Sequence, residues 1–225
     1  MENIFEGYNR IHFDIGANEG VFAIQIAKNE PKTFVMAFEP IPKLVSSITK
    51  STTHLKNFMI LRNAISDFNG EARFNISPES QYGDFSCSSL LDFSDKSKTD
   101  WPGREDFKVI DYIDVDVIRL DSLIIEYKIP KIDYLKIDTQ GSDLKVLEGM
   151  GEFISIVRAG TMEAAAKESI LYNGQNTQEQ SIQFLESNGF EITKIESNDV
   201  HGNEVNIDFV NRNPKQLKFD LWQLI

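Results

Sequence analysis

The run from Asp14 to Gly20 has the residue types and spacing that bind a nucleoside. It reads DIGANEG and follows a short stretch, 11–15, in which apolar and polar residues alternate. Glycines at such a turn permit positive φ and a close approach of the backbone to a ligand. Glu39 follows the apolar run 33–38, about twenty residues after the turn, where a carboxylate can accept hydrogen bonds from both hydroxyls of a ribose.

The spacing of the glycines indicates which kind of nucleoside would bind. A dinucleotide site needs the pattern G-x-G-x-x-G, which brings a pyrophosphate to the N-terminus of a helix. This chain has Gly16-x-x-x-Gly20 instead, with Asp14 before it and Asn18 inside it. We therefore expect a cationic nucleoside without phosphates. Asp14 would face an ammonium group, and Gly16 and Asn18 would pass beneath an amino-acid moiety.

Two carboxylates, Asp138 and Glu163, lie where a second substrate would bind. Each ends a predicted strand, and open α/β sheets bind ligands at the carboxyl ends of their strands. With Gln140, which closely follows Asp138, they are the predicted catalytic residues. Asp138 and Glu163 together could also hold a divalent cation, which prefers carboxylate oxygens. The prediction is a site without a metal, and the metal alternative stays open.

Histidine is the most frequent general base, and the chain contains three. His12 lies in the first predicted strand, where a structural role is expected, and His54 lies in a linker. His201 lies in the turn between the last two predicted strands. We expect it to be far from the site unless that turn folds back.

The elements that must position these residues follow the order of a doubly wound α/β sheet. An apolar period of two predicts strands, and a period near 3.6 predicts helices. The predicted helices are 20–29, 44–51, 120–128, 142–150 and 177–190. The predicted strands are 11–15, 33–38, 58–62, 71–76, 108–120, 132–138, 156–163, 191–195 and 204–210. The last two strands form an antiparallel hairpin, and 108–120 is expected to pair with 71–76 as an inserted hairpin.

Composition and charge limit the class of protein. The 225 residues are compatible with a single domain, 1–225. The net charge of −12 disfavours nucleic acids and anionic membranes as partners, because both bind through Lys and Arg. No apolar run approaches the length of a transmembrane helix, and residues 1–10 lack the pattern of a secretory signal. A cytoplasmic protein is therefore expected.

Five sequence blocks in this order resemble the FkbM family of S-adenosylmethionine-dependent methyltransferases. They are DIGANEG at 14–20, AFEP at 37–40, NAISDFNG at 63–70, LDSL at 120–123 and KIDTQGSDLKVLEG at 136–149. The resemblance extends over residues 11–210. It implies an α/β, Rossmann-like class I methyltransferase fold. Such a fold has a seven-stranded, mostly parallel sheet with a C-terminal antiparallel hairpin, and here an inserted hairpin and loop.

The resemblance also implies a ligand and a reaction. S-adenosyl-L-methionine would be the cofactor, S-adenosyl-L-homocysteine the product, and the acceptor a hydroxyl oxygen of a small molecule such as a sugar or a secondary metabolite. The predicted cofactor-binding residues are Asp14, Gly16, Ala17, Asn18, Gly20, Glu39, Pro40, Asn63 and Ala64. Asp138, Gln140 and Glu163 would face the acceptor. The family pattern usually has Glu at the position of Gln140, so a hydrogen-bonding role is expected there instead of a charged one.

Two segments outside these blocks are expected to complete the site or the assembly. Residues 77–108 are rich in Ser, Asp and Gly with isolated aromatics, which predicts a partly ordered substrate loop or lid with Ser86, Ser88 and Ser89 nearest the cleft. The tail after Asn211 has an apolar end that would dock on the body or on a second subunit, which allows a homodimer. Its apolar residues are Phe219, Leu221, Trp222 and Leu224.

Two alternatives belong to other functional classes. A strand, a glycine turn and a ribose carboxylate also occur in NAD-dependent oxidoreductases, although the missing G-x-G-x-x-G pattern argues against one. A catalytically silent cofactor-binding subunit of a complex is the other alternative, which the Gln at position 140 favours.

Overall fold

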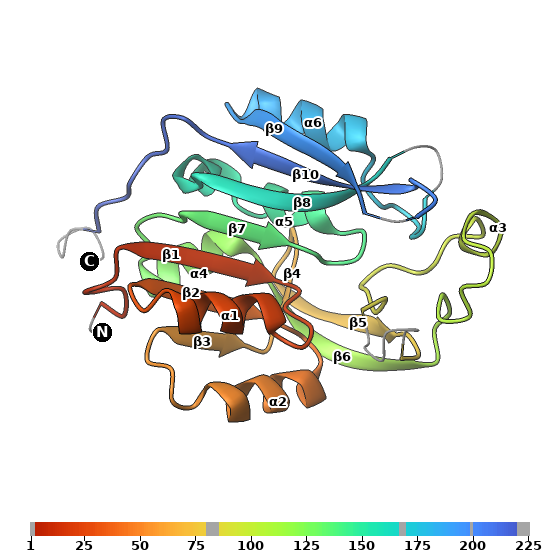
Figure 1. The fold of residues 1–225 in the computed structure, drawn as a ribbon, viewed down its shortest axis with the longest axis horizontal. Coiled ribbons are helices and arrows are strands. Elements are labelled where there is room, and N and C mark those ends of the chain that lie inside the picture. Colours follow the sequence, from red (N-terminus) through yellow and green to blue (C-terminus); the bar gives the residue numbers. More distant parts are fainter. Residues whose placement is uncertain (1–2, 80–85, 167–169, 199, 220–225) are drawn as a thin grey trace.

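The core of the protein is a seven-stranded sheet with the strand order β3-β2-β1-β7-β8-β10-β9 (Figure 1). The computed structural model describes residues 3–79, 86–166, 170–198 and 200–219. The strands of this sheet are β1 (Arg10–Ile15), β2 (Thr33–Phe38), β3 (Phe58–Leu61), β7 (Tyr134–Ile137), β8 (Ala159–Ala165), β9 (Glu191–Ser197) and β10 (Glu204–Val210). Five strands pair in parallel, and β10 pairs antiparallel with both β8 and β9. The predicted fold class is thereby confirmed.

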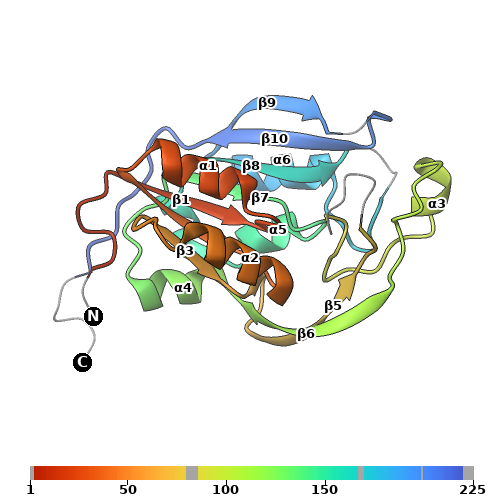
Figure 2. The same ribbon diagram turned by 60° about the horizontal axis from the view of Figure 1, so that its bottom comes forward.

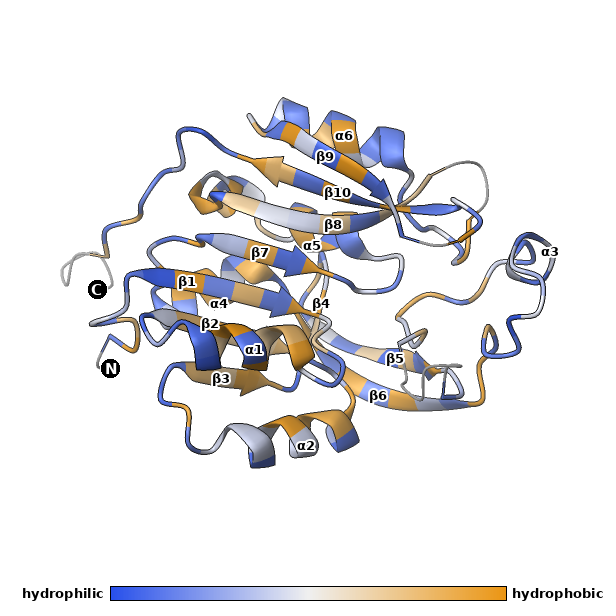
Figure 3. Cartoon of the chain, in the orientation of Figure 1, coloured by the Kyte–Doolittle hydropathy of each residue, from blue (hydrophilic) through white to orange (hydrophobic). Residues whose placement is uncertain are grey.

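Burial explains why these segments are strands. All six residues of β2, TFVMAF, are buried, as expected for a central parallel strand covered on both faces. In β10 only alternate residues are buried: Val205, Ile207 and Phe209 point into the core, and the residues between them are partly exposed. Figure 3 shows the same alternation of hydrophobic and hydrophilic residues along β10.

The helices lie on both faces of the sheet (Figures 1 and 2). Helices α1 (Val21–Asn29) and α2 (Pro42–Thr52) cover β2 and β3 on the face that is in front in Figure 1. Helices α4 (Leu120–Tyr127), α5 (Asp143–Glu148) and α6 (Gln178–Ser187) pack on the opposite face of the sheet. The 3-10 helix η1 (Gly151–Ile156) follows α5 in the chain and contacts α4 and α5. No helix among the described residues is long and apolar enough to cross a membrane.

A second, three-stranded sheet lies beside the carboxyl ends of β1 and β7 (Figure 1). Its order is β4-β6-β5, formed by β4 (Ala64–Ile65), β5 (Gly70–Ile76) and β6 (Asp111–Ile118). Strands β5 and β6 pair antiparallel, as the sequence predicts for the inserted hairpin. The segment between them carries the short helix α3 (Ser97–Asp100) and reaches toward the same end of the main sheet. Tyr82 and Phe85, two of its predicted aromatics, lie outside the described residues.

The C-terminal tail is described as far as Phe219. Leu217 and Phe219 are partly buried against the main core, and the backbone N–H of Leu217 donates to the carbonyl of Pro130. This part of the tail therefore docks on the body of the same chain. Leu221, Trp222 and Leu224 lie outside the described residues, so a homodimer through the tail stays a prediction.

Candidate functional site

The turn after β1 and the strand ends beside it line a cavity, which we call the turn cavity. Its apolar lining residues include Ile41, Ala64, Ile65, Phe74 and Leu90. Its polar lining residues include Asn18, Glu39, Asn63 and Asp138. The apolar side chains suit contact with an aromatic base, and the polar ones suit a ribose and an amino-acid moiety. The donor and acceptor set thus fits a nucleoside without phosphates.

Glu39 is a buried carboxylate that faces this cavity. Its side chain accepts hydrogen bonds from the backbone N–H groups of Asn18 at 2.8 Å and Ile41 at 2.9 Å. Burial raises the pKa of Glu39 to about 7, and the two backbone donors oppose that rise. Each carboxylate oxygen has a second lone pair, so Glu39 can still accept a hydroxyl from a ligand in the cavity.

The turn itself is held in an unusual backbone conformation. Gly16 and Asn18 both have positive φ, of 77° and 51°. The N–H groups of Gly16 and Ala17 both donate to the carbonyl of Phe38, which ties the turn to the end of β2. A β-carbon on Gly16 would lie 1.9 Å from the carbonyl oxygen of Asp138, so glycine is required here by packing against the chain as well as by φ.

Three predicted cofactor residues are not among those that line the turn cavity. Asp14 is 1% exposed, and its carboxylate lies 3.4 Å from the ammonium of Lys136. Ala17 packs in the small core beneath α1, and Gly20 begins α1 against the side chain of Ile48. The ammonium that the sequence predicts beside Asp14 is thus supplied by the chain itself. Gly16, Asn18, Glu39, Pro40, Asn63 and Ala64 do line the cavity.

A second cavity of about 470 Å³ adjoins the first, and we call it the loop cavity because residues 86–107 form one wall. Asp138, Gln140 and Glu163 all line it, as the sequence predicts for the catalytic residues. Ser86, Asp138 and Gln140 also line the turn cavity. The two cavities therefore share these three residues in their walls.

The carboxylate of Asp138 receives one donor on each oxygen. Lys136 Nζ lies 3.2 Å from Oδ2, and Gln140 Nε2 lies 2.8 Å from Oδ1. Lys136 precedes Asp138 by two residues and therefore shares its side of the strand. Burial alone would lower the pKa of Lys136, but the carboxylates of Asp138 and Asp14 outweigh it and raise that pKa. Lys136 is accordingly a charged ammonium between two carboxylates.

Glu163 has a different environment from Asp138. Burial, followed by repulsion from Asp138, raises the pKa of Glu163 well above its ordinary value. A third carboxylate, Asp143, is fully buried behind it and accepts hydrogen bonds from the Glu163 backbone N–H and the Thr139 hydroxyl. Burial and Asp138 raise the pKa of Asp143 as well. Glu163 and Asp143 thus favour the protonated state, whereas two donors face Asp138.

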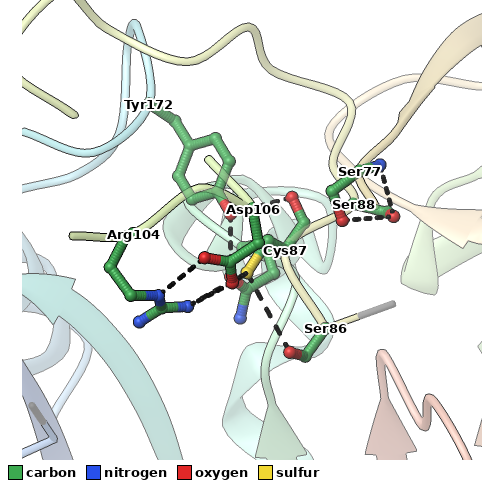
Figure 4. A network of polar contacts seen from close by, with 8 residues as sticks. Ser77, Ser86, Cys87, Ser88, Arg104, Asp106 and Tyr172 are labelled. Carbon is green, nitrogen blue, oxygen red and sulfur yellow. Dashed lines mark hydrogen bonds and ion pairs between the residues drawn. The ribbon is translucent and has the colours of Figure 1, made fainter. Parts of the chain in front are cut away.

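The wall of the loop cavity is built from two segments that are distant in sequence. The Phe93 ring stacks on Tyr172 at 4.9 Å, and the Tyr172 hydroxyl lies 3.0 Å from the carbonyl oxygen of Cys87 (Figure 4). Arg104 donates twice to the carboxylate of Asp106, beside the sulfur of Cys87 (Figure 4). Burial raises the pKa of Cys87 to about 12, so the thiol stays protonated and acts as a packing group.

Two of the three predicted serines of this segment line a cavity, and the third, Ser89, is buried instead. Ser86 and Ser88 line the turn cavity, and the Ser88 hydroxyl accepts from the backbone N–H of Ser77 (Figure 4). Ser89 is fully buried, and its hydroxyl donates to the backbone carbonyl of Gln140 at 2.6 Å. The segment 86–108 is ordered against the strand ends.

Several residues of the site escape the sequence analysis. Lys136 could have been found, because it lies two residues before Asp138 on one face of a strand. Tyr172 carries no local signal. The expectation for His201 is wrong: the turn between β9 and β10 folds back, and His201 lines the loop cavity. Within the part of the chain that the structure describes, no three His, Cys, Asp or Glu side chains are grouped to hold a metal ion.

Comparison with known proteins points to one family. The sequence pattern of the methyltransferase FkbM domain matches residues 14–192. The chain is 27% identical over 173 residues to the 2-O-methyltransferase NoeI of Sinorhizobium fredii, which covers 77% of this chain and 70% of that protein. It is 25% identical over 197 residues to the methyltransferase sdnD of Sordaria araneosa, which covers 80% of this chain and 73% of that protein.

Two further similarities are more distant. The hexuronic acid methyltransferase AglP of Haloferax volcanii is 26% identical over 155 residues, which covers 68% of this chain and 55% of that protein. The structure of Aeropyrum pernix fibrillarin with natively bound S-adenosyl-L-methionine has a TM-score of 0.49 and 12% identity, and covers 92% of this chain and 68% of that one.

Proposed function

The chain belongs to the methyltransferase FkbM domain family, and we propose that, as an S-adenosylmethionine-dependent methyltransferase, it methylates a hydroxyl oxygen of a small molecule such as a sugar. One observation carries the proposal. The turn cavity, whose lining offers the groups that the cofactor needs, and the loop cavity, which has room for an acceptor, share Ser86, Asp138 and Gln140 in their walls. Methyl transfer requires this kind of contact, because donor and acceptor must be aligned at close range.

The turn cavity offers a separate set of groups to each part of the cofactor. Glu39 would accept hydrogen bonds from the ribose hydroxyls. Gly16 and Asn18 would lie along the methionyl part, and the apolar side chains of Ile41, Ile65 and Phe74 would enclose the adenine. When bound, the cofactor supplies an activated methyl group on its sulfonium, so the protein needs mainly to hold the two substrates in line.

At the junction, the chain must also manage the proton of the acceptor hydroxyl. Asp138, with a donor on each oxygen, keeps further lone pairs for that proton. Glu163, whose pKa is raised, would donate a hydrogen bond from its protonated carboxyl to another oxygen of the acceptor. A molecule with several hydroxyls matches this pairing of an acceptor group with a donor group.

The names of two relatives support a hydroxyl oxygen as the methylated atom and a sugar as the acceptor. One is named a 2-O-methyltransferase and another a hexuronic acid methyltransferase. The net charge of −12 favours a small-molecule acceptor over a nucleic acid. Family membership sets the oxidoreductase alternative aside, and a silent subunit is disfavoured because the loop cavity adjoins the cofactor cavity.

The experiment has a binding step and a transfer step. We expect S-adenosyl-L-homocysteine to bind in calorimetric titration, with a loss of affinity in Glu39→Ala. The protein and S-adenosyl-L-methionine are then incubated with a panel of methyl glycosides, and with amino-sugar and aromatic amine controls, and products are identified by mass spectrometry. A methyl ether that requires Asp138 supports the proposal. Folded protein that binds no cofactor, or that methylates amines and no hydroxyl, contradicts it.

A further inference from the structure

Gln140 is held in a strained conformation by contacts from three segments. Its φ is 56°, in the left-handed region that is unfavourable for a non-glycine residue. The Ser89 hydroxyl donates to its backbone carbonyl at 2.6 Å, and the Tyr172 hydroxyl lies 2.9 Å from its side-chain Oε1. Its Nε2 donates to Asp138 at 2.8 Å. The fold thus maintains an unfavourable backbone angle in order to point this amide at Asp138.

The orientation of the amide depends on the charge of Asp138. An ionised carboxylate only accepts hydrogen bonds, so it requires the NH₂ end of the amide. A protonated Asp138 would instead donate its proton, and the amide would turn its oxygen toward it. The structure has the NH₂ end on Asp138 Oδ1 and the Lys136 ammonium on Oδ2. Both donors suit an ionised Asp138.

Tyr172 fixes the other end of the same amide. Its hydroxyl has one proton and two acceptors within reach, Gln140 Oε1 at 2.9 Å and the Cys87 carbonyl oxygen at 3.0 Å. Tyr172 is fully buried and its ring stacks on Phe93, so the hydroxyl cannot move away. In the structure the amide oxygen is directed to Tyr172 and the amide nitrogen to Asp138.

We propose that Gln140 is a positioning residue whose amide, oriented by Tyr172, acts with Lys136 to place one hydrogen-bond donor on each carboxylate oxygen of Asp138, in the wall that the two cavities share. This inference rests on the proposed function, since it assumes that the cofactor occupies the turn cavity. It assigns the proton of the acceptor hydroxyl to Asp138. The other charged or titratable groups that act on Asp138 are Asp14, Glu39, Lys136, Asp143, Glu163 and Tyr172.

The substitution Gln140→Glu tests the contact without any acceptor. It places a carboxyl group at the 2.8 Å contact with Asp138, and two carboxylates at such a distance share one proton. A cationic ligand nearby favours ionisation of the pair, so binding of S-adenosyl-L-methionine should expel that proton. Calorimetric titration in two buffers of different ionisation enthalpy measures the number of protons released.

We expect Gln140→Glu to release up to about one proton more than wild type with S-adenosyl-L-methionine, and fewer with S-adenosyl-L-homocysteine, which lacks the sulfonium charge. The double variant Gln140→Glu, Asp138→Asn should return to the wild-type value. Gln183→Glu, the same change on the exposed face of α6, is the matched control and should release no extra proton. Wild-type proton release in Gln140→Glu overturns the inference. Failure of folded wild type to bind either ligand instead overturns the proposed function.

If Gln140→Glu does not fold, Tyr172→Phe tests the positioning role of Gln140 instead. This substitution removes the hydroxyl that orients the amide and keeps the aromatic ring. The measurement is the ratio of the two dissociation constants, for S-adenosyl-L-methionine and for S-adenosyl-L-homocysteine, because a merely structural change alters both equally. Asp138→Asn should shift the ratio against the cationic ligand by roughly three- to tenfold, and Tyr172→Phe should shift it partway. An unchanged ratio in both variants refutes the proposed role of Gln140 and Tyr172 in positioning Asp138.

Discussion

A β-carbon on Gly16 would lie 1.9 Å from the carbonyl oxygen of Asp138, so the turn after β1 and the end of β7 occupy adjoining space. The first of these residues lines the turn cavity, and the second lines both cavities. Their close packing places the predicted cofactor turn directly beside the predicted acceptor carboxylate. Only a residue without a side chain permits this contact.

Gly16→Ala should therefore destabilise the protein and abolish cofactor binding. The new methyl group would collide with backbone, and the φ of 77° is unfavourable for alanine. We expect a loss of about 3 kcal/mol or more in the free energy of unfolding, measured with urea. Gly189→Ala is the control, since Gly189 has a φ of 83° with nothing within 4 Å of its β-carbon position. Its loss should be only about 1–2 kcal/mol. Equal losses in the two variants would show that the Gly16 contact is unimportant.

Glu39 should make stability depend on pH. Burial raises its pKa from 4.5 to about 7, so between these values the folded protein holds a proton that the unfolded chain has lost. The free energy of unfolding should thus fall as the pH rises through this window, by about 1–3 kcal/mol for this group. Glu39→Gln should remove that part of the slope.

The free energy of unfolding is measured with urea at about pH 5 and about pH 7.5, and the difference between the two values gives its slope with pH. Glu71→Gln, at an exposed position on β5, should leave the slope as in wild type. A slope in Glu39→Gln equal to that of wild type would mean that Glu39 does not hold its proton in the folded state.

Lys136 and Asp14 should be energetically coupled. Lys136→Met leaves the carboxylate of Asp14, which is 1% exposed, without the ammonium 3.4 Å away. We expect a loss of about 3 kcal/mol in the free energy of unfolding, because an unpaired buried charge remains. Asp14→Asn in the same chain should recover part of it. A double-mutant cycle in urea checks the coupling, and strictly additive losses would contradict it.

Phe93 should hold the wall of the loop cavity in place. Its ring stacks on Tyr172 at 4.9 Å and on Phe107 at 5.7 Å. Phe93→Ala should speed hydrogen exchange of amides in 86–108 roughly three- to tenfold while β1 keeps its protection. Phe68→Ala, at a ring in a residue that is 41% exposed, is the control and should change nothing in this segment. Exchange in 86–108 that is unaffected by Phe93→Ala would show that the segment is held by other contacts.

Removal of divalent metals should leave the activity unchanged. A divalent cation on Asp138 would lie close to the Lys136 ammonium, which is 3.2 Å from Oδ2, and the two positive charges would repel each other. After dialysis against a chelator, the affinity for S-adenosyl-L-homocysteine should stay within about twofold, and Mg²⁺ should give no thermal stabilisation. Methyl transfer that needs Mg²⁺ would revive the alternative in which Asp138 and Glu163 bind a metal.

The sequence by itself determined the order of the strands of the main sheet and of the longer helices, the glycine turn and the position of Glu39. It did not indicate the two-residue strand β4 or the short helices α3 and η1. The predicted features depend on local signals: an apolar period of two or 3.6, and glycines where the backbone needs positive φ. The turn and Glu39 each lie at the end of one strand, and neighbouring parallel strands bring such ends together. The position of these groups in the turn cavity could therefore be predicted from short stretches of sequence.

Only the tertiary structure decided how the acceptor half is built. Tyr172 reaches Gln140 from 32 positions away, and His201 reaches the loop cavity because one turn folds back. The tertiary structure also paired Asp14 with Lys136 on the neighbouring strand instead of with a ligand. No local pattern specifies these contacts, because they depend on how irregular segments pack against one another and on which charges burial brings together.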